Sequence, residues 1–145
     1  MADDRPDPVA LLLRGLLALS RRVRAARPAG SVSLSELGIL GSLQRLGPLV
    51  ATRLANEERL QPQSLTRLLS RLQRGRLITR RRNQGDRREI TLSITARGRE
   101  VLRQDLGARR AWLEKAIESS LTSEERAALL TASALMNRLA TYEGR

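Results

Sequence analysis

Two residue types that carry much of protein chemistry are missing from this 145-residue sequence. It contains no cysteine and no histidine, which excludes disulfides, thiol redox sensing, Cys/His zinc sites and histidine acid–base catalysis. The only aromatic residues are Trp112 and Tyr142, whereas proteins that bind nucleic acid by base stacking present several exposed rings. These absences argue against most enzyme classes, against a cofactor or metal, and against stacking as a binding mode.

Long hydrophobic runs are also lacking. The longest are Val9–Leu13 and Leu16–Leu19, short of the roughly 20 residues that a membrane-spanning helix needs. The first eight residues are acidic and rich in turn formers, unlike the basic start of a signal peptide. We therefore expect a cytoplasmic protein that is not an enzyme and has no membrane partner.

Positive charge, by contrast, is in excess. Lysine and arginine number 27 against 15 acidic residues, a net charge of +12, which points to nucleic acid, with an anionic membrane surface as the second choice. Compositional bias can explain why 26 of the 27 are arginine, but it does not explain their placement. Eleven arginines against three acids fall between Arg53 and Arg88, as expected of a phosphate-binding element.

Capping signals and leucine spacing predict helices in the first half of the chain. Asp7 and Pro8 begin a helix to about Ala26, whose wide apolar arc suggests burial against a second copy of the chain. A capping box at Ser33–Glu36 begins the next helix, which Gly47–Pro48 ends. A short helix over about 49–56 and a helix over 62–74 then predict a helix-turn-helix, with leucines on one side of its second helix.

After Gly75 the hydrophobic period changes from that of a helix to that of a strand. Segments 77–82 and 88–94 predict two strands joined by a hairpin tip over 83–86, which together form a basic wing. Thr95 can cap a long helix to about Ser119, and a capping box at Thr122–Glu125 begins a last helix. The predicted fold is mainly α with a small β-hairpin wing, in the order α-α-α-α-β-β-α-α.

This ordered set resembles the MarR family of winged helix-turn-helix regulators across about residues 8–141. The likeness is carried by segments 34–40, 54–55, 62–72, 77–80 and 85–98, the last containing Gly85-Asp-Arg-Arg88 and Thr95-x-x-Gly98. It implies a flexible stretch over 1–7 and a single domain over 8–145. Within that domain, helices in 8–30 and 96–141 would form a dimerisation layer, and 33–94 the winged helix-turn-helix. It further implies an obligate homodimer on a pseudo-palindromic operator in double-stranded DNA.

Two positions depart from the family pattern. Members usually have glycine just after the second helix of the motif, where this chain has Arg76, with Gly75 one residue early. Either the helix ends one residue sooner or Arg76 adopts an unfavourable backbone conformation. The turn over Asn56–Arg59 likewise lacks the glycine that the family commonly places there.

The resemblance suggests which side chains bind DNA. Arg67 lies on the second helix of the motif, where a guanidinium can donate two hydrogen bonds to guanine in the major groove or contact a phosphate. Gln61, Gln63, Ser64 and Thr66 surround it, and Arg71 lies on the same helix. Each of the four polar residues could instead serve only as a helix start.

The wing contributes the remaining predicted contacts. The resemblance assigns one wing arginine to the minor groove, Arg88 before Arg87, and gives Asp86 the role of holding an arginine by a salt bridge. The alternative for this tip is simple solvation. Arg80, Arg81 and Arg82 are expected to contribute phosphate contacts or long-range attraction.

These features favour a sequence-specific regulator of transcription that acts as a homodimer and is associated with the nucleoid. The resemblance is compatible with a small organic effector, and Trp112 would either pack in the core or the dimer interface or line a pocket for that effector. The alternative function is an architectural protein that coats DNA without reading bases.

Overall fold

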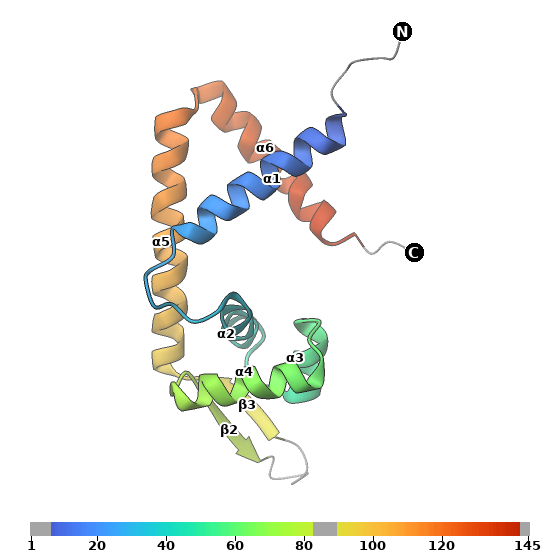
Figure 1. The fold of residues 1–145 in the computed structure, drawn as a ribbon, viewed down its shortest axis with the longest axis vertical. Coiled ribbons are helices and arrows are strands. Elements are labelled where there is room, and N and C mark those ends of the chain that lie inside the picture. Colours follow the sequence, from blue (N-terminus) through green and yellow to red (C-terminus); the bar gives the residue numbers. More distant parts are fainter. Residues whose placement is uncertain (1–6, 83–89, 143–145) are drawn as a thin grey trace. The chain divides into compact units, whose positions relative to one another are not determined.

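The computed structural model of the chain describes residues 7–82 and 90–142 (Figure 1). It divides into two compact units. The helical unit comprises Met1–Ala26 with Arg109–Arg145, and the winged unit comprises Arg27–Ala108. None of the helices in the described ranges combines the length and apolar character that a membrane span requires.

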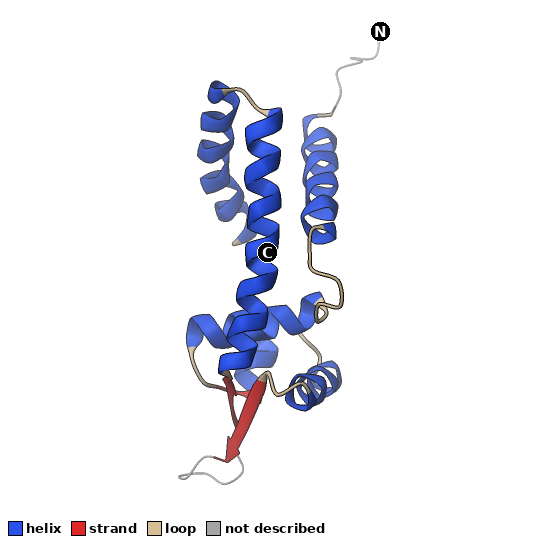
Figure 2. Cartoon of the chain, turned by 90° about the vertical axis from the view of Figure 1, so that its left-hand side faces the viewer, coloured by secondary structure: helices blue, strands red, loops and turns tan. Residues whose placement is uncertain are grey.

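The helical unit consists of α1 (Pro8–Ala25), the second half of α5 (Ala96–Ser120) and α6 (Ser123–Ala140) (Figure 2). The predicted caps are confirmed. Asp7 accepts a hydrogen bond from the backbone N of Val9 at 2.9 Å, and Thr122 and Glu125 form a capping box. No residue of α1 or α6 is buried, and all leucines of α1 and all but Leu129 of those in α6 are exposed.

The winged unit contains three helices and a small sheet before α5 begins. Its elements are α2 (Leu34–Leu46), β1 (Leu49–Val50), α3 (Ala51–Glu57), α4 (Pro62–Arg74), β2 (Ile78–Arg82) and β3 (Ile90–Ile94). The strands are antiparallel in the order β1-β3-β2, with Leu49 and Arg80 both opposite Leu92. The predicted helix-turn-helix, paired wing strands and fold class are confirmed.

The start of the short third helix was predicted wrongly. Leu49 and Val50 are not helical but form β1, and α3 begins only at Ala51, so the observed order is α-α-β-α-α-β-β-α-α. Gly47, at φ 79°, ends α2 and sends the chain in an extended direction. A two-residue strand has no hydrophobic period of its own; it forms because Leu49 is buried beside Leu92.

In the part of the chain that the structure describes, the hydrophobic core lies in the winged unit. Helices α2, α3 and α4 pack with the sheet and the first turns of α5 around one cluster of buried aliphatic side chains. Its members are Leu37, Ile39, Leu40, Leu43, Leu49, Leu54, Leu65, Leu69, Leu72, Leu77, Ile78, Leu92 and Leu102. This core fixes α4 against the rest of the unit.

The end of α4 decides between the two alternatives left by the sequence. The helix ends at Arg74, and Gly75 follows in an ordinary right-handed conformation with φ −72°. Arg76 then takes φ 56°, in the left-handed region that favours glycine. The glycine therefore stands one residue before the position that needs it.

The Thr95-x-x-Gly98 motif joins the sheet to α5. Thr95 Oγ1 donates a hydrogen bond to the carbonyl oxygen of Arg76 at 2.8 Å and accepts one from the backbone N of Gly98 at 3.0 Å. A Cβ at Gly98 would overlap the carbonyl oxygen of Leu77 and lie 2.8 Å from Ile94 Cγ1. Only glycine allows α5 to approach the turn before β2 this closely.

Candidate nucleic-acid interface

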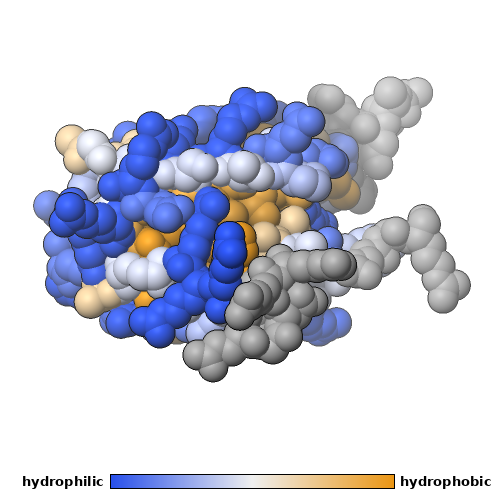
Figure 3. All heavy atoms as spheres, turned by 90° about the horizontal axis from the view of Figure 1, so that it is seen from below, coloured by the Kyte–Doolittle hydropathy of each residue, from blue (hydrophilic) through white to orange (hydrophobic). Residues whose placement is uncertain are grey.

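Helix α4 has one buried side and one exposed side. Leu65, Leu69 and Leu72 are buried in the core. The outward face of α4 consists of exposed polar side chains, namely Gln63, Ser64, Thr66, Arg67, Ser70, Arg71 and Arg74. The helix carries three arginines and no acidic residue. Hydrophilic side chains cover much of the face seen in Figure 3, around a smaller apolar patch.

The polar residues predicted around Arg67 are all exposed. Gln61 is the N-cap residue of α4, but its side chain makes no capping hydrogen bond. Thr66 Oγ1 donates to the carbonyl oxygen of Pro62 at 2.9 Å, so its hydroxyl proton is already used and it offers an oxygen acceptor and a methyl group. Arg67 has no partner among the described residues, which leaves its guanidinium available for a ligand.

Arg71 differs from Arg67 because it is held by another helix. Its Nε lies 3.1 Å from Oε1 of Glu36, a residue of α2. The Glu36 side chain is only 4% exposed, whereas that of Arg71 is 57% exposed. The ion pair therefore has a buried carboxylate and a guanidinium that still reaches solvent.

The turn between α3 and α4 is also fastened to α2. Ser42 Oγ donates a hydrogen bond to a carboxylate oxygen of Glu58. Glu58 lies so close to α2 that a Cβ at Gly38 would overlap it. Arg59 follows with φ 50°, a left-handed conformation at the place where the glycine of the family pattern is missing. The turn thus keeps its shape at the expense of strain at Arg59.

The arginines of β2 alternate between the two sides of the sheet. Arg80 and Arg82 lie on the side of Ile78, and Arg81 lies on the opposite side with Thr79. Arg81 and Arg82 are exposed. Arg80 is half-buried, and its Nε and Nη2 are enclosed without a hydrogen-bond partner among the described residues. Of the three arginines of β2, Arg81 and Arg82 are therefore the ones exposed to a large polyanion.

Comparison with known proteins identifies the family. The MarR family model matches residues 32–90. An uncharacterised HTH-type transcriptional regulator from Mycobacterium bovis is 32% identical over 121 residues, which is 83% of this chain and 84% of that protein. The chain belongs to the MarR family. A transcriptional regulator from Pseudomonas aeruginosa has the same fold, with a TM-score of 0.82, 34% identity and coverage of 93% and 95% of the two chains.

MarR-family membership makes the chain a DNA-binding regulator of transcription. The HTH-type transcriptional repressor MdtR of Bacillus subtilis is also similar, at 35% identity over 94 residues, or 65% of this chain and 60% of the repressor. The family model matches residues 32–90, so α4 lies within the matched segment.

One part of the predicted interface cannot be placed. Asp86, Arg87 and Arg88, predicted at the tip of the MarR wing, lie outside the described residues. Their roles in the minor groove stay predictions.

The sequence did not lead us to predict two residues of the outward face of α4. Ser70 and Arg74 follow Arg67 at spacings of three and seven, which place all three on one side of a helix. Ser70 Oγ donates to the carbonyl oxygen of Thr66 at 2.9 Å. The same helical spacing that identified the buried leucines could have identified both. Glu36 was also missed as a partner of Arg71, and no local pattern indicates that pair.

Proposed function

We propose that this MarR-family regulator binds a pseudo-palindromic operator as a homodimer and reads base sequence through the outward face of α4. The observation that carries the proposal is the polar side of α4, where Arg67 is exposed and unpartnered among the described residues. A helix of this kind enters the major groove, where arginine and short polar side chains can contact base edges.

The helical unit supports the homodimer. Among the described residues, every buried aliphatic side chain lies between Leu37 and Leu102, whereas α1 exposes Leu12, Leu16 and other leucines along its length. Apolar faces of this extent are stable in water only when covered. A second copy of the chain supplies the matching surface, because a two-fold axis pairs each helix with its equivalent. We expect an interface of about 2,000 Å² or more.

Sedimentation velocity at micromolar concentration tests the dimer. Leu16→Glu places a charge on the apolar side of α1 and is expected to produce monomers. Leu34→Glu is the matched control, because Leu34 is equally exposed, at 40% against 39% for Leu16, but belongs to the winged unit. A folded wild-type monomer, or equal dissociation by both variants, would contradict the proposal.

Selection from a randomised duplex library tests sequence reading. A specific regulator should enrich a palindromic motif and bind it about a thousandfold more tightly than a scrambled duplex at fixed salt. An architectural protein should enrich no motif and bind both duplexes alike. Equal affinities would therefore replace operator recognition with DNA coating in the nucleoid.

A cavity in the winged unit favours a response to a small organic effector. It measures about 320 Å³ and is lined by residues 28–32, Gly75, Leu77 and Val101, with Arg97, Gln104 and Asp105 as its charged and amide groups. Asp105 is already paired with Arg27, so the apolar lining and the Arg97 guanidinium suit a small organic anion. A thermal-shift screen of aromatic carboxylates should give hits that Arg97→Ala removes. Hits retained by Arg97→Ala, or the absence of hits, would speak against this site.

A further inference from the structure

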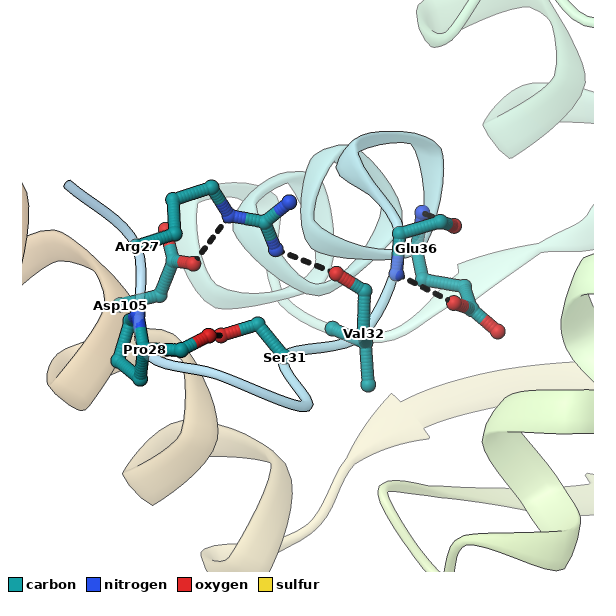
Figure 4. Close-up of polar contacts among 7 residues, drawn as sticks. Arg27, Pro28, Ser31, Val32, Glu36 and Asp105 are labelled. Atoms are coloured by element: carbon teal, nitrogen blue, oxygen red, sulfur yellow. Dashed lines mark hydrogen bonds and ion pairs between the residues drawn. The ribbon is translucent and has the colours of Figure 1, made fainter. Parts of the chain in front are cut away.

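Glu36 uses both of its carboxylate oxygens. Oε2 accepts a hydrogen bond from the backbone N of Ser33 at 2.7 Å, completing the capping box of α2 (Figure 4). Oε1 faces α4 and lies 3.1 Å from Nε of Arg71. Capping requires only one oxygen, so a glutamine would serve α2 equally well. The second oxygen and the negative charge therefore need a separate explanation.

A buried carboxylate is unfavourable at this place for two reasons. Burial removes the charge from water, and a negative charge beside a DNA-binding helix repels phosphate groups. The attraction to Arg71 offsets the first penalty, but pairing with Arg71 also withdraws positive charge from the helix. Simple electrostatics would thus select against Glu36 in a protein that binds DNA.

The geometry of Arg71 resolves this conflict. Glu36 contacts Nε, and the guanidinium has no other partner among the described residues. Its two terminal NH₂ groups are therefore left over in a side chain that is 57% exposed. Arg71 follows Arg67 by four residues and precedes Arg74 by three, so all three are neighbours on the helix surface.

We infer that Glu36 is a positioning residue for DNA binding, which holds Arg71 by Nε so that its terminal NH₂ groups are presented to a backbone phosphate of the operator. An unheld arginine loses considerable side-chain entropy when it binds a ligand. Arg71 is already ordered by Glu36 before DNA arrives, and its planar fork suits a phosphate. The inference rests on operator binding by α4, as proposed above.

The test measures the affinity of the intact protein for the duplex selected by the wild type. Glu36→Gln keeps a capping oxygen but removes the charge and one contact. It is expected to weaken binding about threefold to tenfold, the affinity equivalent of ordering one side chain. Charge alone predicts the opposite sign, because removing an acid from a DNA-binding surface should tighten binding.

A double-mutant cycle isolates the positioning role. Arg71→Ala is expected to weaken binding, and adding Glu36→Gln to it should then tighten binding, because only the repulsive charge remains to be lost. Glu57→Gln is the matched control: Glu57 is an acid on α3, its side chain is 35% exposed, and its partner Arg45 lies 3.7 Å away on α2. It is expected to tighten binding slightly in both backgrounds.

Each outcome has one interpretation. If the wild type selects no duplex, operator binding itself fails. If the wild type does select a duplex, two results overturn the inference and leave Glu36 only as the cap of α2. One is that Glu36→Gln binds the duplex as tightly as the wild type or more tightly; the other is that Glu36→Gln changes the affinity in the same direction with and without Arg71→Ala. Should Glu36→Gln fail to fold, Arg71→Lys decides, since one ammonium cannot hold both Glu36 and a phosphate as a fork does. The Arg71→Lys variant should bind the duplex as weakly as Arg71→Ala, and wild-type affinity of Arg71→Lys would overturn the inference.

Discussion

Arg27 Nε donates a hydrogen bond to Asp105 Oδ1 at 2.6 Å, which ties the segment after α1 to α5 (Figure 4). The Asp105 side chain is 2% exposed and that of Arg27 is 15% exposed. Nη2 of Arg27 also donates to the carbonyl oxygen of Val32. The pair thus fixes the path of the chain into α2 against the helix that follows the wing.

Removing one partner of this pair should destabilise the protein strongly. Asp105→Ala leaves the Arg27 guanidinium largely buried without a counter-charge and is expected to lower the free energy of unfolding by about 3–5 kcal/mol. Urea denaturation at fixed protein concentration measures the loss. Glu100→Ala, which removes an exposed pair with Arg103, should lower stability far less, because solvent screens that pair. Losses of similar size for both variants would contradict the prediction.

Glycine at position 76 should stabilise the protein. Arg76→Gly relieves the left-handed strain at φ 56°, partly offset by the greater freedom of glycine in the unfolded chain, for a net gain of about 1 kcal/mol. Arg76→Ala removes the same charge but keeps a Cβ, so it should give no such gain. Thermal unfolding compares the two. At Arg59, the glycine variant should likewise be more stable than the alanine variant. Equal stabilities of the glycine and alanine variants would exclude backbone strain as the cause.

Gly98 and Gly107 should respond oppositely to alanine although both lie on α5. Gly98→Ala would force a Cβ against the Leu77 carbonyl and is expected to destabilise by about 1–3 kcal/mol or more. At Gly107 nothing lies within 4 Å of a Cβ, so alanine should stabilise the helix by up to about 1 kcal/mol. Guanidinium unfolding curves give both values. A tolerated Gly98→Ala would show that α5 can move away from the sheet.

The starts of the capped helices were predicted well because they depend on residues that are neighbours in sequence. Ser33 and Glu36 cap α2 through side-chain contacts that span three residues, so the pattern alone determines them. The strand β1 depends instead on Leu92, more than forty positions away, and two residues cannot show a period. Its helical assignment failed for that reason.

In the candidate site, too, local patterns were predictable from the sequence and tertiary contacts were not. The leucine spacing predicted which side of α4 faces outward, and that side carries Arg67. The pair of Glu36 with Arg71 joins two helices through tertiary packing, and no local pattern encodes it. The absence of glycine at Arg76 did signal an anomaly, but only the structure shows that strain, not a shortened helix, is the outcome.

Arg81 should contribute to affinity without contributing to specificity. It is exposed on β2, on the opposite side of the sheet from half-buried Arg80. If it contacts a phosphate, Arg81→Ala should weaken binding to all duplexes alike and reduce the slope of log K against log salt by about 0.9 per contact. Arg110→Ala, which removes the same charge from α5 in the helical unit, should leave the slope unchanged. Equal slopes for the wild type and Arg81→Ala would mean that Arg81 does not contact DNA.

Arg67 should instead read a base. If its guanidinium donates both hydrogen bonds to one guanine, Arg67→Ala should lose about 1–3 kcal/mol per half-site on the selected duplex and little on duplexes already altered at that base. Arg67→Lys should not restore binding, because one ammonium cannot span both acceptors. Arg74→Ala is the control on the same outward face and should lose affinity equally on every duplex if Arg74 contacts only phosphate. Anisotropy titrations of these variants against single-base duplex variants measure the difference. Equal losses for Arg67→Ala on every duplex would make Arg67 a phosphate contact and assign base reading to Gln63, Ser64 or Thr66.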